Sequence, residues 1–593
     1  MEVFKLENWR LKTIKVDPSN LAKELNLSSM LSKLMVNRGL TNINDAKMFL
    51  DSGLNNLRDP KGIKDLVKGV EILKEGIDNK KNILIVGDYD VDGVISTYVI
   101  YSALKRCGAC VNYHIPDRIT EGYGINESII RNAKDNNVDI IITCDNGIAA
   151  IDQIQLAKDL GMEVIITDHH DIPFIELENG EKEYITPNAD AIVNPKQLDC
   201  KYEFKKLCGA GVIYKLVQVL YEELDIDQKE AEDFLQFVAI ATVCDVVDLV
   251  DENRIIVKNG LRQLNNSSNL GLNCLIEETG LNEKEITVYS LGFVIGPCIN
   301  ASGRLEFAGL ALELLFTDDK EQAKALSKKL NDLNTERQKL TQLGLEEAIN
   351  QVAEKDMISD NKVLVIFIPD VHESIAGIIA GRVREKYNLP AIVLTKAHDG
   401  AKGSGRSIEE YNMFEELVKC KDLLGKFGGH PMAAGLSIPT ENIDDFRNTI
   451  NSNCLLTCED VIPKVFIDLH LPISYITFEL VEELSLLEPF GKGNAKPTFG
   501  ARGLKVRNAK ILGKNKNVLK LTLQENNRLM EAIYFGDIEK FIDRLKEKYG
   551  DLEYMRVMDG KENNVLIDLV YYPEINEFRG NRKLQINISN YRF

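Results

Sequence analysis

Carboxylates and imidazoles follow three apolar segments in the first third of the chain. Asp88-Tyr89-Asp90-Val91-Asp92-Gly93 comes after 83–86, Asp145 comes after 140–142, and Asp168-His169-His170 comes after 164–166. Such segments are typical of buried parallel strands, whose carboxyl ends lie at the sheet edge where ligands bind. Carboxylates with histidine and no matching cysteine set suit Mg2+ or Mn2+ better than structural zinc.

The spacing Asp88-x-Asp90-x-Asp92-Gly93 predicts a divalent-cation site at a strand-to-helix turn. The three carboxylates can surround a cation there, and Gly93 permits a close backbone approach. A calcium loop of the EF-hand kind needs flanking helices and a distal Glu, whereas a buried strand precedes this motif. The alternative is a solvated acidic turn.

Asp145 and the two histidines extend this candidate site. Asp145 ends the second strand and could bridge two ions. Adjacent side chains at a strand end point in different directions. We therefore expect one of His169 and His170 to bind metal and the other to face a substrate.

Asp245 completes the candidate ligand set. It follows the apolar helical segment 238–242, where an isolated charge is costly unless it is paired or bound to metal. Asp248 is a weaker candidate. A cluster of this kind can hold two cations about 3.5–4 Å apart, the arrangement used for in-line attack on phosphorus.

Cationic and glycine-rich segments later in the chain suggest phosphate recognition. We expect a loop over 296–304 that ends in Arg304, and glycine-rich turns over 403–407 and 428–431. Such turns can form anion-binding nests, although many are only turns. The candidate phosphate ligands from this pattern are Arg304, His372, Arg382, Ser404, Arg406 and His430.

The pattern of apolar residues predicts five parts in the 593 residues. These are a helical cap over 1–75, a parallel α/β domain over 76–317, a long connecting helix over 318–352, a smaller α/β domain over 353–458, and a β-rich domain over 459–593. The connecting helix could instead be a surface helix of the first domain. About five strands in the last part are typical of an OB barrel, at 503–511, 518–523, 530–535, 565–571 and 584–588.

Composition sets broad limits on function. No apolar run is long enough to span a membrane, and the first ten residues lack an apolar signal core, so we expect a cytoplasmic protein. The net charge of −19 for the whole chain disfavours binding of nucleic acid. Residues 501–593, however, contain 18 Lys and Arg against 13 Asp and Glu. This excess of basic residues is compatible with a cationic channel for nucleic acid, and equally with a surface that is merely solvated. The 11 cysteines show no disulfide or zinc framework.

Taken in order, these motifs resemble the DHH phosphoesterase superfamily. The segments 403–407 and 428–430 look like its DHHA1 domain. Pro489-Phe490-Gly491-x-Gly493-Asn494, followed by the basic β-rich part, is similar to the RecJ branch of 5′→3′ single-stranded-DNA exonucleases. The resemblance implies an α/β fold in which a parallel-sheet DHH domain is joined by a long helix to DHHA1, with an OB-like domain after it.

The resemblance also implies roles for individual residues. Two Mn2+ or Mg2+ ions would be held by Asp88, Asp90, Asp92, Asp145, His169 and Asp245. His170 would contact the scissile phosphate, oriented by Asp168, and Arg304 would assist catalysis. Asn300, Arg304, His372, Ser404, Arg406 and His430 would hold strand phosphates, and Arg382 is added as a nearby cation. The strand would thread between the two α/β domains, with a 5′-phosphate pocket setting polarity.

The expected activity is release of 5′-mononucleotides from single-stranded DNA in repair and recombination. A single-strand-binding protein and a DNA helicase are expected partners, and a monomer is expected. Cys298 stands where many relatives have Arg, which removes a phosphate contact or transfers it to a neighbour. One alternative is a phosphoesterase acting on nanoRNA, phosphoadenosine phosphate or cyclic dinucleotides. Another is a non-catalytic replication scaffold.

Overall fold

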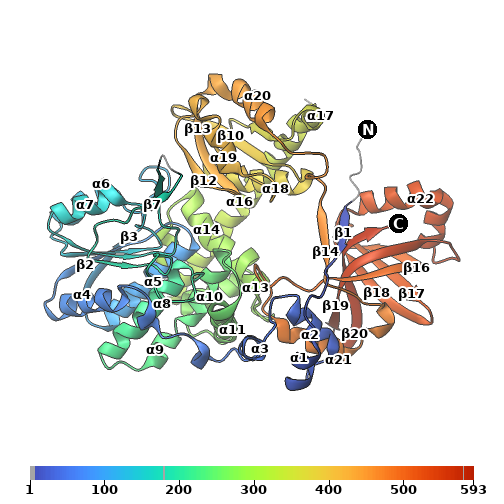
Figure 1. Ribbon diagram of the computed structural model, residues 1–593, viewed down its shortest axis with the longest axis horizontal. Coiled ribbons are helices and arrows are strands. Elements are labelled where there is room, and N and C mark those ends of the chain that lie inside the picture. The colour runs from blue at the N-terminus through green and yellow to red at the C-terminus, as the bar shows by residue number, and fades with distance from the viewer. Residues whose placement is uncertain (1–6, 178–179, 355, 514, 579) are drawn as a thin grey trace. The chain divides into compact units, whose positions relative to one another are not determined.

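The computed structural model describes residues 7–177, 180–354, 356–513, 515–578 and 580–593 (Figure 1). These residues form two compact units. The first comprises Leu57–Val247 and Ile255–Pro463, and the second comprises the residues up to Asn56, Asp248–Arg254 and Lys464–Phe593.

The first unit contains a five-stranded parallel sheet in the order β3-β2-β4-β5-β8. Its strands are β2 (Asn82–Val86), β3 (Cys110–His114), β4 (Ile140–Cys144), β5 (Glu163–Thr167) and β8 (Ala191–Val193). The three apolar segments that precede the acidic motifs are therefore neighbouring parallel strands, as the sequence predicts.

Helices cover both faces of this sheet (Figure 1). Side chains such as Ile166 pack with α6 (Glu127–Asp135) and α7 (Ile151–Asp159). The preceding residue on the strand, Ile165, points to the other face, where it lies against Gly69 of α4 (Leu66–Asp78). This burial on both faces explains why the strands are continuous apolar runs.

The first acidic motif starts a helix directly. Asp90 is the N-cap of α5 (Val91–Arg106), and its side chain accepts a hydrogen bond of 3.0 Å from the Gly93 amide. An Asp at this position satisfies a free amide of the first helical turn, so the helix begins within the acidic motif itself. The α8 helix (Gly209–Glu223) packs beside α5.

A helical region follows the sheet. It contains α10 (Leu235–Cys244), α11 (Asp251–Leu264), α12 (Leu270–Glu278), α13 (Val288–Ser290), the π-helix η3 (Leu291–Ile295), α14 (Gly296–Leu305) and α15 (Gly309–Phe316). The expected loop over 296–304 is wrong, because this segment is the helix α14. Its glycine, proline and serine suggested a loop. In the folded chain its small residues Ala301, Ser302 and Gly303 are buried, and a Cβ added at Gly303 would lie 2.4 Å from the Tyr89 carbonyl oxygen. The helix α14 also packs on α16 (Lys320–Glu354).

The α16 helix is the predicted long connection, and it leads to a smaller α/β domain. After α17 (Met357–Asp360) come β9 (Leu364–Phe367), α18 (Glu373–Tyr387), β10 (Ala391–Ala397), β11 (Gly400–Arg406), α19 (Met413–Val418), β12 (Phe427–His430), β13 (Ala433–Ile438) and α20 (Ile443–Asn453). The sheet order is β12-β13-β11-β10-β9.

The two glycine-rich segments of this domain are strands, not the turns that we expected. Segment 403–407 lies largely in β11, and segment 428–431 lies largely in β12. Glycine serves close packing here: a Cβ added at Gly405 would lie 3.0 Å from the sulfur of Met413. Glycines within a strand mark such close approaches as well as turns.

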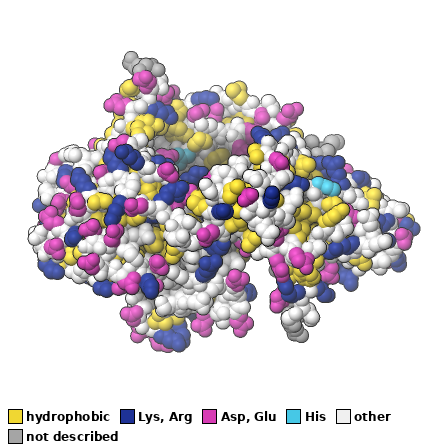
Figure 2. Space-filling model, turned by 60° about the horizontal axis from the view of Figure 1, so that its bottom comes forward, with side chains coloured by type: hydrophobic (Ala, Val, Ile, Leu, Met, Phe, Trp, Pro, Cys, Tyr) yellow, Lys and Arg dark blue, Asp and Glu magenta, His cyan; other side chains and the backbone are white. Residues whose placement is uncertain are grey.

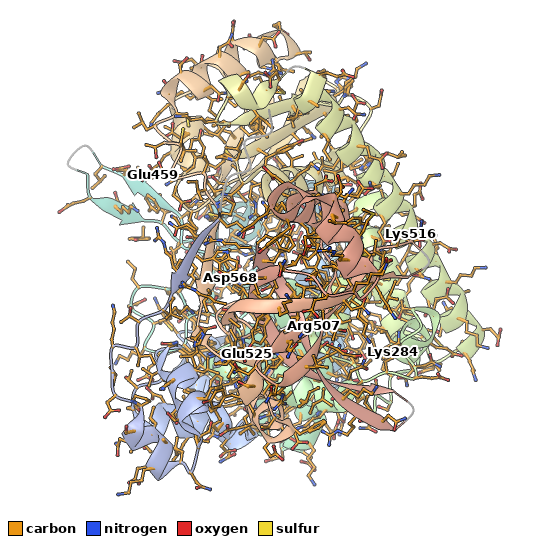
Figure 3. All side chains as sticks on the ribbon, turned by 90° about the vertical axis from the view of Figure 1, so that its right-hand side faces the viewer. Lys284, Glu459, Arg507, Lys516, Glu525 and Asp568 are labelled. Atoms are coloured by element: carbon orange, nitrogen blue, oxygen red, sulfur yellow. The ribbon has the colours of Figure 1, made fainter. Side chains whose placement is uncertain are left out.

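The second unit contains a closed barrel. Its strands are β15 (Leu469–His470), β16 (Phe499–Leu512), β17 (Val518–Glu525), β18 (Arg528–Tyr534), β19 (Leu566–Phe578) and β20 (Asn581–Arg592). Closure follows because β16 pairs with both β17 and β19. All five predicted strands are present. Figure 3 faces this unit and labels Arg507 on β16, Glu525 on β17 and Asp568 on β19.

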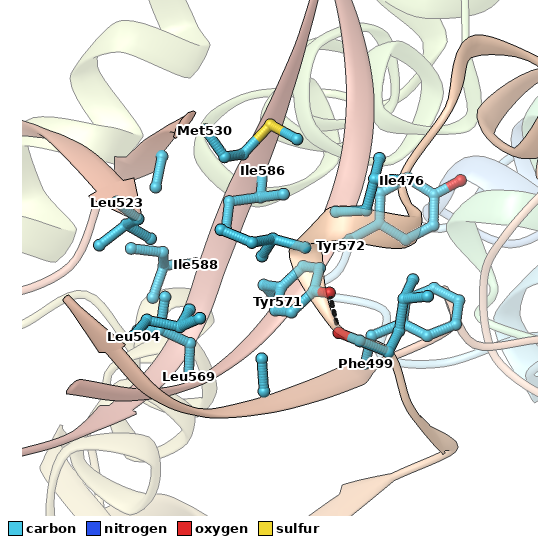
Figure 4. Packing of buried hydrophobic residues seen from close by; sticks show 14 of the residues in the cluster. Ile476, Phe499, Leu504, Leu523, Met530, Leu569, Tyr571, Tyr572, Ile586 and Ile588 are labelled. Carbon is cyan, nitrogen blue, oxygen red and sulfur yellow. Dashed lines mark hydrogen bonds between the residues drawn. The ribbon is translucent and has the colours of Figure 1, made fainter. Parts of the chain in front are cut away.

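Apolar side chains fill the barrel. Phe499, Leu504, Leu569 and Ile586 are fully buried, and the Tyr571 hydroxyl donates a hydrogen bond to the Leu471 carbonyl (Figure 4). The helix α22 (Ile538–Met558) lies between β18 and β19 in the chain. Two further strands, β1 (Asn8–Leu11) and β14 (Lys464–Ile467), form a parallel pair in this unit.

The expected N-terminal cap over 1–75 is divided between the two units. Leu31, Leu34 and Met35 of α2 (Ser29–Val36) share a hydrophobic core with the barrel unit, as does Phe49 of α3 (Ile43–Leu50). α1 (Ser19–Glu24) and α21 (Phe478–Leu484) also belong to this unit. Residues 57–75 instead join the first unit, where α4 packs on the sheet. No helix in the described part of the chain is long and apolar enough to cross a membrane.

Candidate metal centre

The carboxyl ends of β2, β4 and β5 bring the predicted ligands together. Three sets of three side chains each have ligand atoms that lie within 4.8 Å of one another. The sets are Asp88, Asp90 and Asp145; Asp92, His169 and Asp245; and Asp145, His169 and His170. Asp245 enters as the C-cap of α10. The six predicted metal ligands therefore form one cluster.

Four buried atoms in this cluster have no hydrogen-bond partner among the described residues. They are Asp88 Oδ1, Asp145 Oδ1, His169 Nε2 and Asp245 Oδ2. His169 Nε2 lies 3.0 Å from Asp145 Oδ1 and 3.7 Å from oxygens of Asp92 and Asp245. Unsatisfied buried polar atoms are costly, and bound divalent cations would satisfy these four. The oxygen-rich donor set fits Mg2+ or Mn2+.

The carboxylates repel one another in the absence of a cation. Burial, followed by the charge of Asp90, raises the pKa of Asp88 and raises the pKa of Asp92 to about 7. Burial and the neighbouring Asp92 raise the pKa of Asp145 and bring the pKa of Asp245 to about 8. Bound cations would reverse these shifts, because they stabilise the charged form of each group.

Two main-chain features fix the carboxylates. Asp92 accepts hydrogen bonds of 2.6 and 2.8 Å from the amides of Gly209 and Ala210 at the start of α8. Asp145 has left-handed backbone geometry, with φ 62°. A Cβ added at Gly209 would lie only 2.7 Å from Asp145 Cβ, so this glycine allows α8 to approach the cluster.

The adjacent histidines differ in protonation. Burial and the charge of His170 lower the pKa of His169 to about 3, so its ring is neutral and can bind metal. Burial opposes charge on His170 too, but its 2.7 Å hydrogen bond to Asp168 raises its pKa to about 9. Asp168 is also buried, yet the hydrogen bonds from His170 and the Ile148 amide lower its pKa to about 2.

A cationic pocket of about 650 Å³ lies in the first unit. It is lined in part by Tyr89, Arg118, Tyr123, Arg304, Ser404 and Arg406. The Tyr123 hydroxyl donates a hydrogen bond of 2.9 Å to the Asp145 carbonyl, so the pocket adjoins the ligand cluster. Burial, with repulsion from Arg118, lowers the pKa of Arg304 to about 10, and its side chain remains a cation at neutral pH.

The predicted phosphate ligands divide into two groups. Arg304, Ser404 and Arg406 line this pocket. Arg406 Nη1 donates to Ser404 Oγ at 2.8 Å, and Arg304 Nη1 donates to the Ser374 carbonyl at 2.7 Å. The other four do not line the pocket. Arg382 lines a different cavity, His372 is the N-cap of α18, His430 is exposed on β12, and Asn300 is half-buried on α14.

The sequence reasoning missed Arg118 and Tyr123. The Arg118 guanidinium lies 4.7 Å from the centre of the Tyr89 ring, and Tyr123 bonds Asp145. Both follow β3, whose carboxyl end lies at the same sheet edge as those of β2 and β4. Extending the strand-end argument to β3 would have found them.

Cys298 is buried beside another guanidinium. Asn334 Nδ2 donates to the Cys298 sulfur at 3.5 Å, and Asn334 Oδ1 accepts hydrogen bonds of 3.1 and 2.9 Å from Nε and Nη2 of Arg337. Asn334 thus links the Cys298 sulfur to the guanidinium of Arg337.

The fold and the cluster define the DHH/DHHA1 class of phosphoesterases. The DHH family N-terminal domain matches residues 82–242, and the DHHA1 domain matches residues 360–454. The RecJ OB domain matches residues 467–590.

The chain belongs to the RecJ family. It is 35% identical over 575 residues to the single-stranded-DNA-specific exonuclease RecJ of Bacillus subtilis (strain 168), covering 96% of this chain and 69% of that protein. It is 32% identical to the single-stranded-DNA-specific exonuclease RecJ of Haemophilus influenzae, and the match covers 91% of this chain and 92% of that protein. The crystal structure of RecJ from Thermus thermophilus in complex with Mn2+ has a TM-score of 0.80, with 26% identity, and the match covers 99% of this chain and 79% of that one. The predicted fold class is therefore confirmed.

Proposed function

We propose that this protein hydrolyses single-stranded DNA in the 5′→3′ direction and releases 5′-mononucleotides. The observation that carries the proposal is the position of the four unpartnered ligand atoms next to a pocket lined by three arginines. A metal cluster beside a cationic pocket suits phosphodiester hydrolysis. The names of the relatives, single-stranded-DNA-specific exonucleases, support the choice of substrate.

Two divalent cations, Mn2+ or Mg2+, would be held by Asp88, Asp90, Asp92, Asp145, His169 and Asp245. When bound, such ions activate a water molecule and stabilise charge on the phosphoryl oxygens. The Thermus thermophilus structures titled with Mn2+ and with Mg2+ support either metal.

His170 and Asp168 supply the proton chemistry of the chain itself. The Asp168 carboxylate holds the proton on His170 Nδ1, which leaves Nε2–H to donate to a phosphoryl oxygen. A cationic imidazole in this position stabilises negative charge as it develops in the transition state.

Arg304, Arg406 and Ser404 hold the phosphates of the strand, and their pocket takes the 5′-terminal phosphate. His372, Arg382, Asn300 and His430 lie outside this pocket, so their contacts would be with other parts of the strand. A guanidinium can bind a phosphate through two parallel hydrogen bonds, so a terminal phosphate with more free oxygens is favoured. This preference would set the polarity of digestion.

We further propose that the protein acts as a cytoplasmic monomer in DNA repair and recombination, with a helicase and a single-strand-binding protein supplying the strand. The basic C-terminal residues support strand binding. The acidic net charge does not oppose it, since acidic and basic side chains are interspersed over the face shown in Figure 2.

The test is digestion of a single strand that carries a 5′ label, with Mn2+ present. We expect labelled mononucleotide to appear first, no cutting of a blunt duplex, and no activity in Asp145→Ala. Late release of the 5′ label would contradict the proposed polarity. Cleavage of dinucleotides or cyclic dinucleotides alone would indicate the small-substrate phosphoesterase. An intact strand, with Asp145→Ala behaving like the parent, would indicate the scaffold.

A further inference from the structure

Two aromatic side chains stack on each other at the surface of the first unit. The rings of Tyr289 and Phe293 have centroids 4.9 Å apart and an interplanar angle of 21°. They are 67% and 68% exposed. Phe293 lies on the π-helix η3, a rare element that is frequently found at functional sites. A preformed, exposed ring pair is a surface on which a planar group can stack.

A cationic cavity of about 670 Å³ adjoins this ring pair. Its lining includes Phe293, Pro297, Arg337, Lys339 and Arg382. Among the residues that the structure describes, no carboxylate pairs with Arg337 or Arg382. Arg337 instead donates two hydrogen bonds to the side-chain oxygen of Asn334. Burial, and then repulsion from Arg382, lowers the pKa of Arg337. Two guanidinium groups that repel each other and have no carboxylate partner favour an anion between them.

This cavity continues towards the metal cluster. Ile378 of α18 lines both this cavity and the pocket that contains Arg304 and Arg406. The ring pair is also fixed relative to the cluster, because η3 packs on α10, whose C-cap is Asp245. A Cβ added at Gly292 of η3 would lie 3.5 Å from Val243 near the end of α10.

We propose that Tyr289, Phe293, Arg337 and Arg382 form a second subsite for the single strand, separate from the pocket for its terminal phosphate. A base stacks on the ring pair, and a backbone phosphate lies between the two guanidinium groups. This subsite rests on the proposed function and deepens it, because it makes affinity depend on strand length. Aromatic platforms next to cationic grooves bind single strands without sequence preference.

The test compares strand length in binding and in hydrolysis. The double substitution Tyr289→Leu and Phe293→Leu keeps apolar bulk but removes both rings. Anisotropy of labelled strands of 2 to 12 nucleotides, measured in EDTA so that nothing is cut, should show about a tenfold loss of affinity for the longest strand. The loss should shrink as the strand shortens to a dinucleotide. Circular dichroism melting verifies folding.

Two further variants sharpen this test. Arg382→Gln should weaken long-strand binding and flatten its salt dependence. Leu198→Ala removes an equally exposed apolar side chain of the same unit and should bind strands as the parent does. In Mn2+ assays, the double variant should raise KM for long strands more than it lowers kcat.

The outcomes separate the two proposals. Parent-like binding of the 12-mer by the double variant, or a loss equal at every length, would overturn the subsite. If the parent cuts no strand in Mn2+ while the length-dependent loss of binding persists, the proposed function fails and the strand-binding subsite stands.

Discussion

His170 Nδ1 lies 2.7 Å from the carboxylate of Asp168, within a buried network that also includes the Ile148 amide. This hydrogen bond gives the two adjacent histidines different protonation states. It keeps His170 protonated, whereas the neighbouring His169 stays neutral and directs Nε2 into the ligand cluster. A single carboxylate thus sets the protonation of one imidazole without entering the cluster itself.

Asp168→Asn should slow hydrolysis without removing the metal. The amide keeps the shape of the side chain but loses the charge that raises the pKa of His170 to about 9. We expect kcat to fall about 100-fold, in the range of a lost proton donor, with Mn2+ affinity nearly unchanged. NMR titration of the metal-free protein should show the His170 pKa moving towards about 6.5. A change in kcat below about threefold would contradict the role of the pair.

Asp145→Asn should stabilise the metal-free protein and abolish its stabilisation by Mn2+. Removing a buried charge among other carboxylates relieves repulsion, so Tm without metal should rise. The upward shift of Tm on adding Mn2+ should disappear, because this shift reflects binding to the folded state. The control is Asp152→Asn, an exposed carboxylate on α7, which should leave both quantities unchanged. A lower metal-free Tm in Asp145→Asn would refute the argument.

Mn2+ affinity should rise with pH and then level off. Burial and neighbouring carboxylates raise the pKa values of Asp92 and Asp245 to about 7 and about 8, so these groups hold protons below those values and must release them to bind metal. The rise should therefore fall between about pH 6 and 9, by up to about tenfold per pH unit for each proton released. Calorimetry in buffers of different ionisation enthalpy measures the released protons, and a flat profile would exclude the raised values.

Gly377→Ala and Gly381→Ala form a matched pair on α18. Alanine should stabilise a helix at either position by up to about 1 kcal/mol. At Gly377 the new methyl group would lie 2.8 Å from Arg406 Nη2 and 2.9 Å from Ser404 Oγ, whereas at Gly381 it would face open space. We expect KM to rise about tenfold only in Gly377→Ala, because displaced phosphate ligands misplace the strand. Equal kinetics in the two variants would remove Arg406 and Ser404 from substrate binding.

Arg254→Lys should destabilise the second unit. The buried guanidinium donates to three carbonyls, those of Phe49, Leu486 and Leu487, at 2.9 to 3.0 Å. Lysine cannot satisfy all three with the same geometry, and the loss should cost about 2–3 kcal/mol. Hydrogen exchange of the amides of residues 29–50 measures this loss of stability. Arg262→Lys, on the same helix α11 but exposed, should have little effect.

Two segments rich in small residues were predicted wrongly from their local composition, because packing with distant residues determines their structure. Glycine, proline and serine over 296–304 suggested a loop, but Gly296 and Gly303 allow the helix α14 to approach Cys244 and Tyr89 closely. The glycines over 403–405 suggested a turn, but they lie in β11 against β10 and Met413. Local propensity is a weak guide where long-range packing supplies the stabilisation.

The sequence by itself determined the parallel strands, the acidic residues at their ends, the long helix and the five barrel strands. Each of these depends on periodicity and on residue type along a short segment, which the chain encodes locally. Only the tertiary structure decided that Arg304 of α14 lies beside Ser404 and Arg406 of β11 in one pocket, and that the described residues up to Asn56 belong with the barrel. These relationships join residues far apart in the chain, so they depend on how whole elements pack rather than on any local pattern.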